Sequence, residues 1–292
     1  MGEKDATEKT LESYADVFAD IVNVLLFDGR RIIDPEDLRD ALPRSIYKAD
    51  GKLHEQERDT AKFWLSGQIR IALLGLENQT EIEEDMALRV ISYDGAAYRD
   101  QMNRDQTGKP KERYPVVTLV LYFGYQKHWD KPLNLKGRFN IPKELDPYVN
   151  DYHVNLFEIA WLPDETIAMF QSDFRFVSDY FSQKRKSQQY KAPAGEMKHV
   201  RAVLELLSAV MQDTRFMDAY NKRIEEGRAV NMDAWIDEAE NRGREEGRAE
   251  GRKDAMLQSV NKLMTKKGWS MDEALDVLDV PQKDRALIAS QL

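Results

Sequence analysis

Three polar residues that could handle a divalent metal follow an apolar run: Glu77, Asn78 and Gln79 come directly after residues 73–76, Leu-Leu-Gly-Leu. The pattern predicts a strand over residues 69–79, in which side chains alternate between two faces. Glu77 and Gln79 then share one face, and Asn78 points away from it. A carboxylate at the end of an apolar strand is costly unless it meets a metal, a cation or water. Glu77 is therefore a candidate metal ligand, although a strand that simply ends in a solvated turn would explain it as well.

A second acid on the preceding predicted strand could reach the same face. Residues 57–65 also alternate, and Asp59 is the polar exception on their more apolar face. Ser66-Gly67 turns the chain between the two strands, which predicts a hairpin. Cross-strand partners share a face, so Asp59 joins Glu77 only if the numbers of paired residues add to an even sum. We therefore expect a three-residue loop or a bulge, and the three-residue loop puts Asp59 opposite Gly75.

The chemistry of such a pair is that of a hydrolytic metal site. Two carboxylates on neighbouring strands suit a divalent cation that polarises a phosphodiester and activates water. Asp59 and Glu77 are hard oxygen ligands, and Gln79 can hydrogen-bond the attacking water or a phosphate oxygen. The chain has no cysteine and only four scattered histidines, which argues against thiolate and zinc sites. We expect Mg²⁺ or Mn²⁺, with Ca²⁺ as a further candidate.

Composition bounds the class of protein. With 292 residues the chain can form one large domain or two of ordinary size, and its hydrophobic fraction of 42% supports a real core. No run of about 18 apolar residues occurs, so we expect no membrane span. The polar N-terminal residues lack the apolar core of a signal peptide, and we expect a cytoplasmic location.

Charge is unevenly distributed along the chain. The net charge of −9 argues against a general nucleic-acid coat protein. Two basic clusters could nevertheless contact phosphates, although solvated loops and helix ends often carry such clusters too. The candidate contacts are Lys109, Lys111 and Arg113 in the first cluster and Lys184, Arg185 and Lys186 in the second.

The elements that would hold the hairpin alternate between helix and strand, which predicts the α/β class for residues 11–190. Asp28-Gly29 should end the first helix, and Thr80-Glu81-Ile82-Glu83 fits a capping box for a later one. The expected elements are a helix from residue 11 to about residue 25, a short helix opened by Pro35 with Asp34 as its N-cap, a helix through residues 86–97, a doubly buried strand at 115–125, a strand at 154–161 and a helix at 173–184.

The remainder, residues 195–292, has a purely helical pattern. An amphipathic helix is expected over residues 196–220, and a charged helix over residues 233–267. The charged helix carries glycines at four-residue spacing (Gly243, Gly247, Gly251), which fits close helix packing or an exposed helix held by Glu/Arg pairs. Residues 268–292 should form a small helical hairpin that starts with a capping box, Ser270 to Glu273.

Several of these segments carry a family resemblance. Their order is Asp16-Val-Phe-Ala-Asp20, Glu57-Arg-Asp59, Gly75-Leu-Glu77-Asn-Gln79, Met86-Ala-Leu-Arg89 with Tyr93, the apolar stretch 114–124, and the Gly-Arg-Glu-Glu-Gly-Arg tail. Together they resemble the recombination-promoting nuclease family, often labelled as transposases, within the PD-(D/E)XK nuclease superfamily.

This resemblance implies a restriction-endonuclease-like fold, a mixed central sheet flanked by helices and followed by an α-helical C-terminal region. It implies a metal-dependent DNA endonuclease linked to recombination or mobile elements, with Asp59 and Glu77 as metal-binding acids and Gln79 in the position of the usual lysine. Asp16 or Asp20 would correspond to the acid on the first helix. Arg58 stands where the superfamily has proline.

The alternative function is a catalytically inactive nuclease-fold protein that acts as a DNA-binding or protein-interaction module. DNA is the expected partner. The C-terminal helices are then candidates for assembling homo-oligomers.

Overall fold

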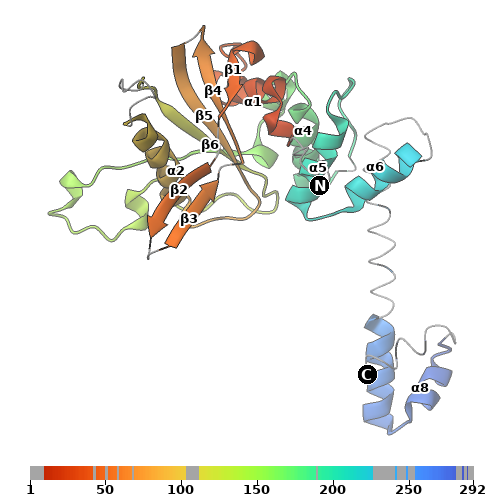
Figure 1. Ribbon diagram of the computed structural model, residues 1–292. Helices are drawn as coiled ribbons and strands as arrows, with labels where there is room; N and C mark the ends of the chain where they lie inside the picture. Colours follow the sequence, from red (N-terminus) through yellow and green to blue (C-terminus); the bar gives the residue numbers. More distant parts are fainter. Residues whose placement is uncertain are drawn as a thin grey trace, which may run out of the picture. The chain divides into compact units, whose positions relative to one another are not determined.

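A five-stranded mixed sheet forms the centre of the first of two compact units in the computed structural model (Figure 1). The units are Met1–Ala229 and Val230–Leu292. The structure describes residues 10–41, 44–49, 52–57, 59–67, 69–102, 112–188, 190–225 and 254–280, together with residues 241, 248, 285 and 288.

The sheet has the strand order β1-β4-β5-β6-β7. β1, β4 and β5 pair antiparallel, whereas β5, β6 and β7 run parallel. A separate two-stranded antiparallel sheet is formed by β2 and β3. The strands are β1 Leu38–Asp40, β2 Arg44–Ala49, β3 Lys52–Glu57, β4 Thr60–Ser66, β5 Ile69–Gln79, β6 Val116–Tyr122 and β7 Asn155–Glu158.

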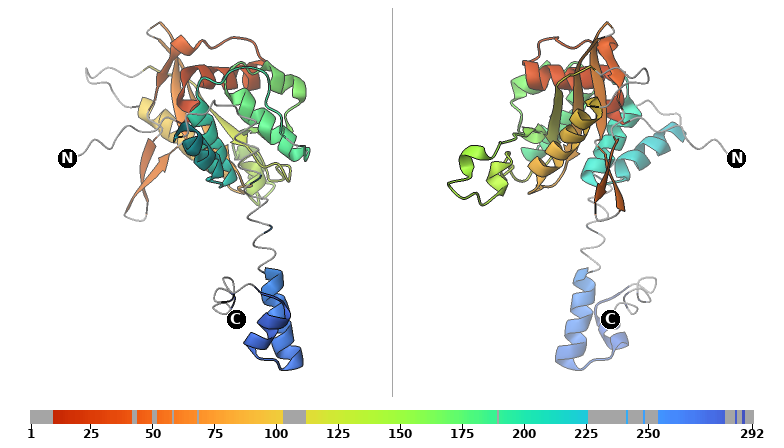
Figure 2. Two further views of the ribbon diagram at one scale, coloured as in Figure 1. Left: turned by 90° about the vertical axis from the view of Figure 1, so that its right-hand side faces the viewer. Right: turned by 60° about the vertical axis from the view of Figure 1, so that its left-hand side comes forward.

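Helices cover both faces of the central sheet (Figure 2). Alternation along β4 shows which helix lies on which face: Ala61 packs in a cluster with Ala97 of α2, whereas Lys62 lies over the ring of Phe18 of α1. The helices of this unit are α1 Ala15–Phe27, α2 Met86–Gln101, α3 Asp164–Met169, α4 Phe174–Arg185, α5 Val200–Met211 and α6 Arg215–Glu225, with 3₁₀ turns η1 Leu11–Ser13, η2 Pro35–Asp37, η3 Lys136–Arg138, η4 Asp146–Tyr148 and η5 Ile159–Trp161.

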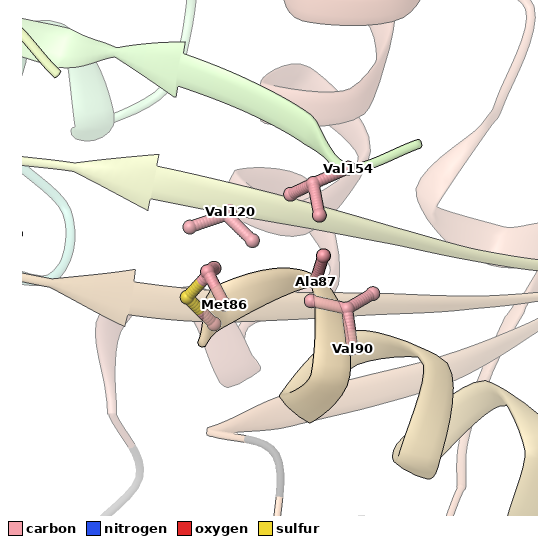
Figure 3. Close-up of a cluster of buried hydrophobic side chains, with 5 residues drawn as sticks. All are labelled: Met86, Ala87, Val90, Val120 and Val154. Atoms are coloured by element: carbon pink, nitrogen blue, oxygen red, sulfur yellow. The ribbon is translucent and has the colours of Figure 1, made fainter. Parts of the chain in front are cut away.

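The first turn of α2 is anchored on the sheet by apolar side chains (Figure 3). Met86, Ala87 and Val90, which recur at helical spacing, pack against Val120 of β6 and against Val154 just before β7. All are at most 7% exposed. This contact fixes where the next residues of α2 meet the carboxyl end of β5.

The α/β prediction, with a mixed sheet flanked by helices and a helical C-terminal region, is confirmed. The strand predicted at 115–125 is the buried central strand β6, and the helix predicted at 173–184 is α4. Asp28 and Gly29 end α1 with left-handed backbone angles, as expected. α5 and α6 fold within the first unit, and the predicted boundary of the nuclease domain near residue 190 stays a prediction.

The hairpin that joins β4 and β5 confirms one expectation and corrects another. Ser66 pairs with Ile69, and the register then shifts between Trp64 and Leu65. This bulge gives the even register that was expected. The predicted partner of Gly75, Asp59, was wrong, because Ala61 lies opposite Gly75. The hairpin has a two-residue turn and a bulge in place of the three-residue loop, and this combination shifts the pairing by two residues.

The predicted strand 57–65 was also wrong in its start. Glu57 ends β3 in the separate sheet, and β4 begins at Thr60. Asp59 lies in a bend between them, and its carboxylate takes the backbone N–H of Asn78 that a strand carbonyl would otherwise accept.

The other local corrections have similar causes. The capping box at 80–83 was wrong because Glu83 accepts the N–H of Asp85 and α2 starts only at Met86. The strand expected at 154–161 ends at Glu158, where the chain enters η5. The single helix expected at 196–220 is two, because Gln212 adopts a left-handed conformation and Asp213 accepts the N–H of Arg215.

The predictions for Pro35 and for the helix with glycines at four-residue spacing have different outcomes. Pro35 opens a 3₁₀ turn, in which the Asp34 side chain accepts from Arg31 and makes no cap. Gly243, Gly247 and Gly251 lie outside the described residues. No helix in the part of the chain that the structure describes is long and apolar enough to cross a membrane.

In the second unit, residues 254–267 are helical and α8 spans Met271–Val277. The predicted capping box at its start is confirmed: the Ser270 side chain accepts the N–H of Glu273, and the Glu273 carboxylate accepts from Ser270. Val260, Ala274 and Leu275 belong to the buried cluster that holds the two helices together.

Replacing Ser270 with alanine should destabilise α8 by about 1 kcal/mol, because the first-turn N–H loses its acceptor. Hydrogen exchange of the full chain, read from peptides covering residues 271–277, should then be about fivefold faster. Ser259→Ala is the matched control, since the Ser259 hydroxyl donates to the carbonyl oxygen of Ala255, one turn earlier in its own helix. Equal exchange in Ser270→Ala and wild type would contradict the cap.

Candidate active site

Glu77 lies at the end of β5 and is buried, with 2% of the residue exposed. Its Oε1 atom forms an ion pair with Arg89 of α2. The same atom accepts from Gln79 Nε2 at 3.2 Å and from Tyr93 OH at 3.5 Å. The predicted sharing of one face by Glu77 and Gln79 is therefore confirmed.

α2 supplies the cation that balances Glu77. Arg89 and Tyr93 are four residues apart and so lie on one side of the helix, joined by a bond of 3.2 Å from Arg89 Nε to the Tyr93 hydroxyl. Burial works against the charged guanidinium, yet the bond to Tyr93 and the charge of Glu77 raise the pKa of Arg89. Burial, and then the charge of Glu77, also raise the pKa of Tyr93, so its phenol keeps its proton.

Asp59 reaches the same strand end from the bend before β4. Its Oδ2 atom accepts the backbone N–H of Asn78 at 2.6 Å. Thr60, the first residue of β4, pairs with Leu76. If this pairing continued for one more residue, Asp59 would lie opposite Glu77. Its charge is near enough to contribute to the raised pKa values of Tyr93 and Glu12. The structure thus brings the two predicted acids to one end of β5.

Glu12 is the acid that sequence reasoning missed. It lies in η1, is 1% exposed, and accepts from the Asn78 side chain at 3.0 Å. Burial raises the pKa of Glu12 from 4.5 to about 7, and the nearby charge of Asp59 adds to this rise. The helical pattern of Leu11, Tyr14 and Phe18 gave no reason to expect Glu12 in the interior. The amide at Asn78, on the other face of β5 from Glu77, was the one available signal.

Asp16 and Asp20, the two candidates for an acid on the first helix, have other partners. Asp16 lies 3.2 Å from the Nε2 atom of His199. Asp20 accepts the backbone N–H groups of Gln171 and Ser172, at 2.8 and 2.7 Å. These contacts tie α1 to the segment between α3 and α4 and to the residue before α5. Asp16 and Asp20 stay predictions, whereas Glu12 is bonded directly to β5.

The donor set fits a hard divalent cation. Asp59 and Glu77 are carboxylates at one end of β5. Glu12 and the buried Oδ1 atom of Asn78, which meets no hydrogen-bond donor in the described part of the chain, lie toward the other face of the strand. Among the described residues, no three acidic or histidine side chains converge to form a metal site by themselves. One or two carboxylates with water are the usual protein ligands of Mg²⁺, which this arrangement can provide.

The predicted nucleic-acid contacts lie in two places. Arg113 bonds the carbonyl oxygen of Gln101, and Lys109 and Lys111 lie outside the described residues. At the end of α4, Lys184 and Arg185 stack on aromatic rings, and Lys186 pairs with Asp164 at 2.6 Å.

A family described as "Putative transposase, YhgA-like" matches residues 71–218, which is half of the chain. The chain belongs to this family. Comparison with the curated proteins and with the solved structures gave no match. The family relationship confirms the resemblance seen in the sequence.

The part of the chain matched to the YhgA-like family contains only one side of the candidate site. It includes Glu77, Gln79, Arg89 and Tyr93, whereas Glu12 and Asp59 precede its first residue. The structure adds these two acids to the family region.

Replacing Glu12 with glutamine should stabilise the protein in a pH-dependent way. Because the folded-state pKa is about 7 and the ordinary value is 4.5, the unfolded chain binds fewer protons between these values. Stability therefore falls as the pH rises through this window. At pH 8, Glu12→Gln should be more stable than wild type by about 3 kcal/mol, with no difference at pH 4.

Urea unfolding in metal-free buffer at the two pH values measures this difference. The exposed Glu144→Gln variant is the control and should follow wild type at both. Identical pH dependence for Glu12→Gln and wild type would contradict a buried, protonated Glu12.

Proposed function

We propose that this protein is a divalent-metal-dependent DNA endonuclease that hydrolyses phosphodiester bonds. The observation that carries the proposal is the end of β5, where buried Glu77 is fixed by Arg89, Gln79 and Tyr93 while Asp59 is held next to it by Asn78. Membership in a transposase family supports DNA as the substrate.

The chain's own groups have separate parts in this proposal. Asp59 and Glu77 would hold Mg²⁺ or Mn²⁺, which when bound supplies a Lewis acid for the phosphate and lowers the pKa of water. Arg89, Tyr93 and Gln79 all bond to Oε1 of Glu77 and so orient its carboxylate. Glu12, with a pKa of about 7, can hold or release a proton near neutral pH.

Gln79 stands where the superfamily pattern has lysine, and it brings no charge. In the structure the positive charge beside Glu77 comes from Arg89 instead. We therefore propose that Arg89 compensates for the missing lysine in neutralising the carboxylate. The cytoplasm as the place of action and self-association through the C-terminal helices belong to the same proposal.

A second candidate function is favoured by this glutamine and by the absence of a three-carboxylate cluster among the described residues. It is a DNA-binding or protein-interaction module that keeps the nuclease fold without activity. As a DNA-binding module, such a protein would bind DNA and would not cut it.

Incubation of the purified 292-residue chain with supercoiled plasmid, in Mg²⁺, Mn²⁺ or EDTA, separates the two functions. The nuclease should nick the plasmid with Mg²⁺ or Mn²⁺ and leave it intact in EDTA, and an Asp59→Asn/Glu77→Gln double variant should not nick. Nicking by both proteins would reveal a contaminant or another site. Binding without nicking by wild type would establish the inactive module.

A further inference from the structure

A second cluster lies at the same end of the sheet, one and two strands away from Glu77. The ring of His128 stacks on Trp161 with 3.6 Å between centroids, and the guanidinium of Arg185 lies 4.7 Å from the centre of the Trp161 ring. These residues come from the segment after β6, from η5 and from the end of α4. We call His128, Trp161 and Arg185 the aromatic platform.

The aromatic platform is fixed by hydrogen bonds, although its outer ring is exposed. His128 Nδ1 lies 3.2 Å from both carboxylate oxygens of Glu158, the last residue of β7. The indole N–H of Trp161 donates to the carbonyl oxygen of Gly124 at 3.0 Å. The His128 side chain is nevertheless 62% exposed. An aromatic ring held in one orientation and open to solvent is prepared to stack on a ligand.

Two lysines are sequence neighbours of the platform residues: Lys184 precedes Arg185, and Lys127 precedes His128. Lys184 lies 5.5 Å from the ring centres of both Tyr125 and Tyr180. Lys127 is exposed and pairs with Asp130 at 2.6 Å. Such a surface suits a nucleic-acid strand, because lysine and arginine can meet phosphates while the exposed ring of His128 can stack on a nucleobase.

The register of the parallel strands gives the separation between the strand ends that carry Gln79 and Glu158. Gln79 pairs with Tyr122, and Tyr122 pairs with Glu158. The backbone N–H of Phe123 also donates to Gln79 at 2.8 Å. Two strand spacings separate β5 from β7, which is about 10 Å. This is the length of about three stacked nucleotides along one DNA strand, at about 3.4 Å each.

We propose that the exposed face of His128 binds an unpaired nucleobase of the DNA strand that is cut at Glu77. The inference rests on the proposed function for the identity of the strand, and it adds the site that holds the nucleotides beside the scissile bond. The competing explanation is structural: the His128–Glu158 contact would only pin the segment after β6 to β7.

Fluorescence anisotropy with a labelled single-stranded DNA 20-mer, in EDTA and at low salt, tests the platform without cleavage. His128→Ala should weaken binding about tenfold, and His128→Tyr should restore most of the affinity because it returns a ring. His153→Ala is the matched control: His153 is also exposed, pairs with Asp151 and precedes β7. It should bind like wild type.

A second arm uses the same oligonucleotide with abasic sites. Wild type should bind this abasic probe about tenfold more weakly than the intact oligonucleotide. His128→Ala should bind both probes with equal affinity, because the ring and the base form one contact. Unchanged binding by His128→Ala, a loss that tyrosine does not rescue, or no binding by wild type would each overturn the proposal. If the proposal for His128 fails, the protein should still nick plasmid. If the proposed nuclease function fails, nicking is absent but binding still depends on the ring of His128.

Discussion

Glu77→Gln is expected to lower metal-dependent plasmid nicking at least 100-fold. The variant keeps the size and the carbonyl acceptor of the side chain, so Arg89 and Tyr93 retain a bonding partner and the fold should persist. It removes the negative charge that a metal ligand needs. Loss of the transition-state stabilisation that a bound metal supplies, worth several kcal/mol, corresponds to a factor of this size.

The matched control is Glu81→Gln, four residues farther along the chain and exposed. It should nick at the wild-type rate. Circular dichroism and thermal unfolding of both variants should show that the fold is kept. A Glu77→Gln protein that nicks within about threefold of wild type would remove Glu77 from the proposed chemistry.

Arg89→Met is expected to destabilise the first unit by about 3 kcal/mol at pH 7. The variant leaves the carboxylate of Glu77, with a side chain only 3% exposed, without its cation. Removing one partner of a buried ion pair is costly because the remaining charge stays desolvated. Urea unfolding of the full chain measures the change in the free energy of unfolding.

Two further variants isolate the buried charge as the cause. Arg31→Met breaks an exposed ion pair with Asp34 and should cost at most about 0.5 kcal/mol. The double variant Glu77→Gln/Arg89→Met should be more stable than Arg89→Met alone, because no unpaired charge is left. Additive losses in the double variant would contradict the coupling between Arg89 and Glu77.

Local patterns in the sequence predicted the strand that carries the site. The apolar run before Glu77 and the period-two alternation are properties of one segment, and β5 with Glu77 and Gln79 on one face follows from them. The even register of the hairpin was also predictable, because side-chain faces constrain it. The choice between a longer loop and a bulge was not, since both give an even sum.

Contacts between distant segments could not be predicted in the same way. Glu12 and Asn78 are 66 positions apart, and only the packing of η1 on the sheet brings them together. Arg89 was part of the family resemblance, but its contact with Glu77 was not predicted. The length of the turn before α2 decides which face of α2 meets Glu77. The capping box predicted at residues 80–83 would start the helix before Met86, where α2 begins. A helix that starts earlier does not predict which face of α2 meets Glu77.

The platform shows the same limit for the basic clusters. Lys184, Arg185 and Lys186 were predicted as one group of phosphate contacts. In the structure Arg185 stacks on Trp161 and Lys186 pairs with Asp164, so neighbouring residues have different partners. A charge cluster in the sequence identifies a basic surface, and the fold determines which of its members remain available to a ligand.

The most direct test of the metal site is a crystal of the 292-residue chain soaked in Mn²⁺, with the anomalous signal of manganese recorded. A peak is expected at the end of β5 between the carboxylates of Glu77 and Asp59, and it should be absent from crystals of Glu77→Gln. No peak there, or one that persists in Glu77→Gln, would contradict the assignment of this strand end as the metal centre.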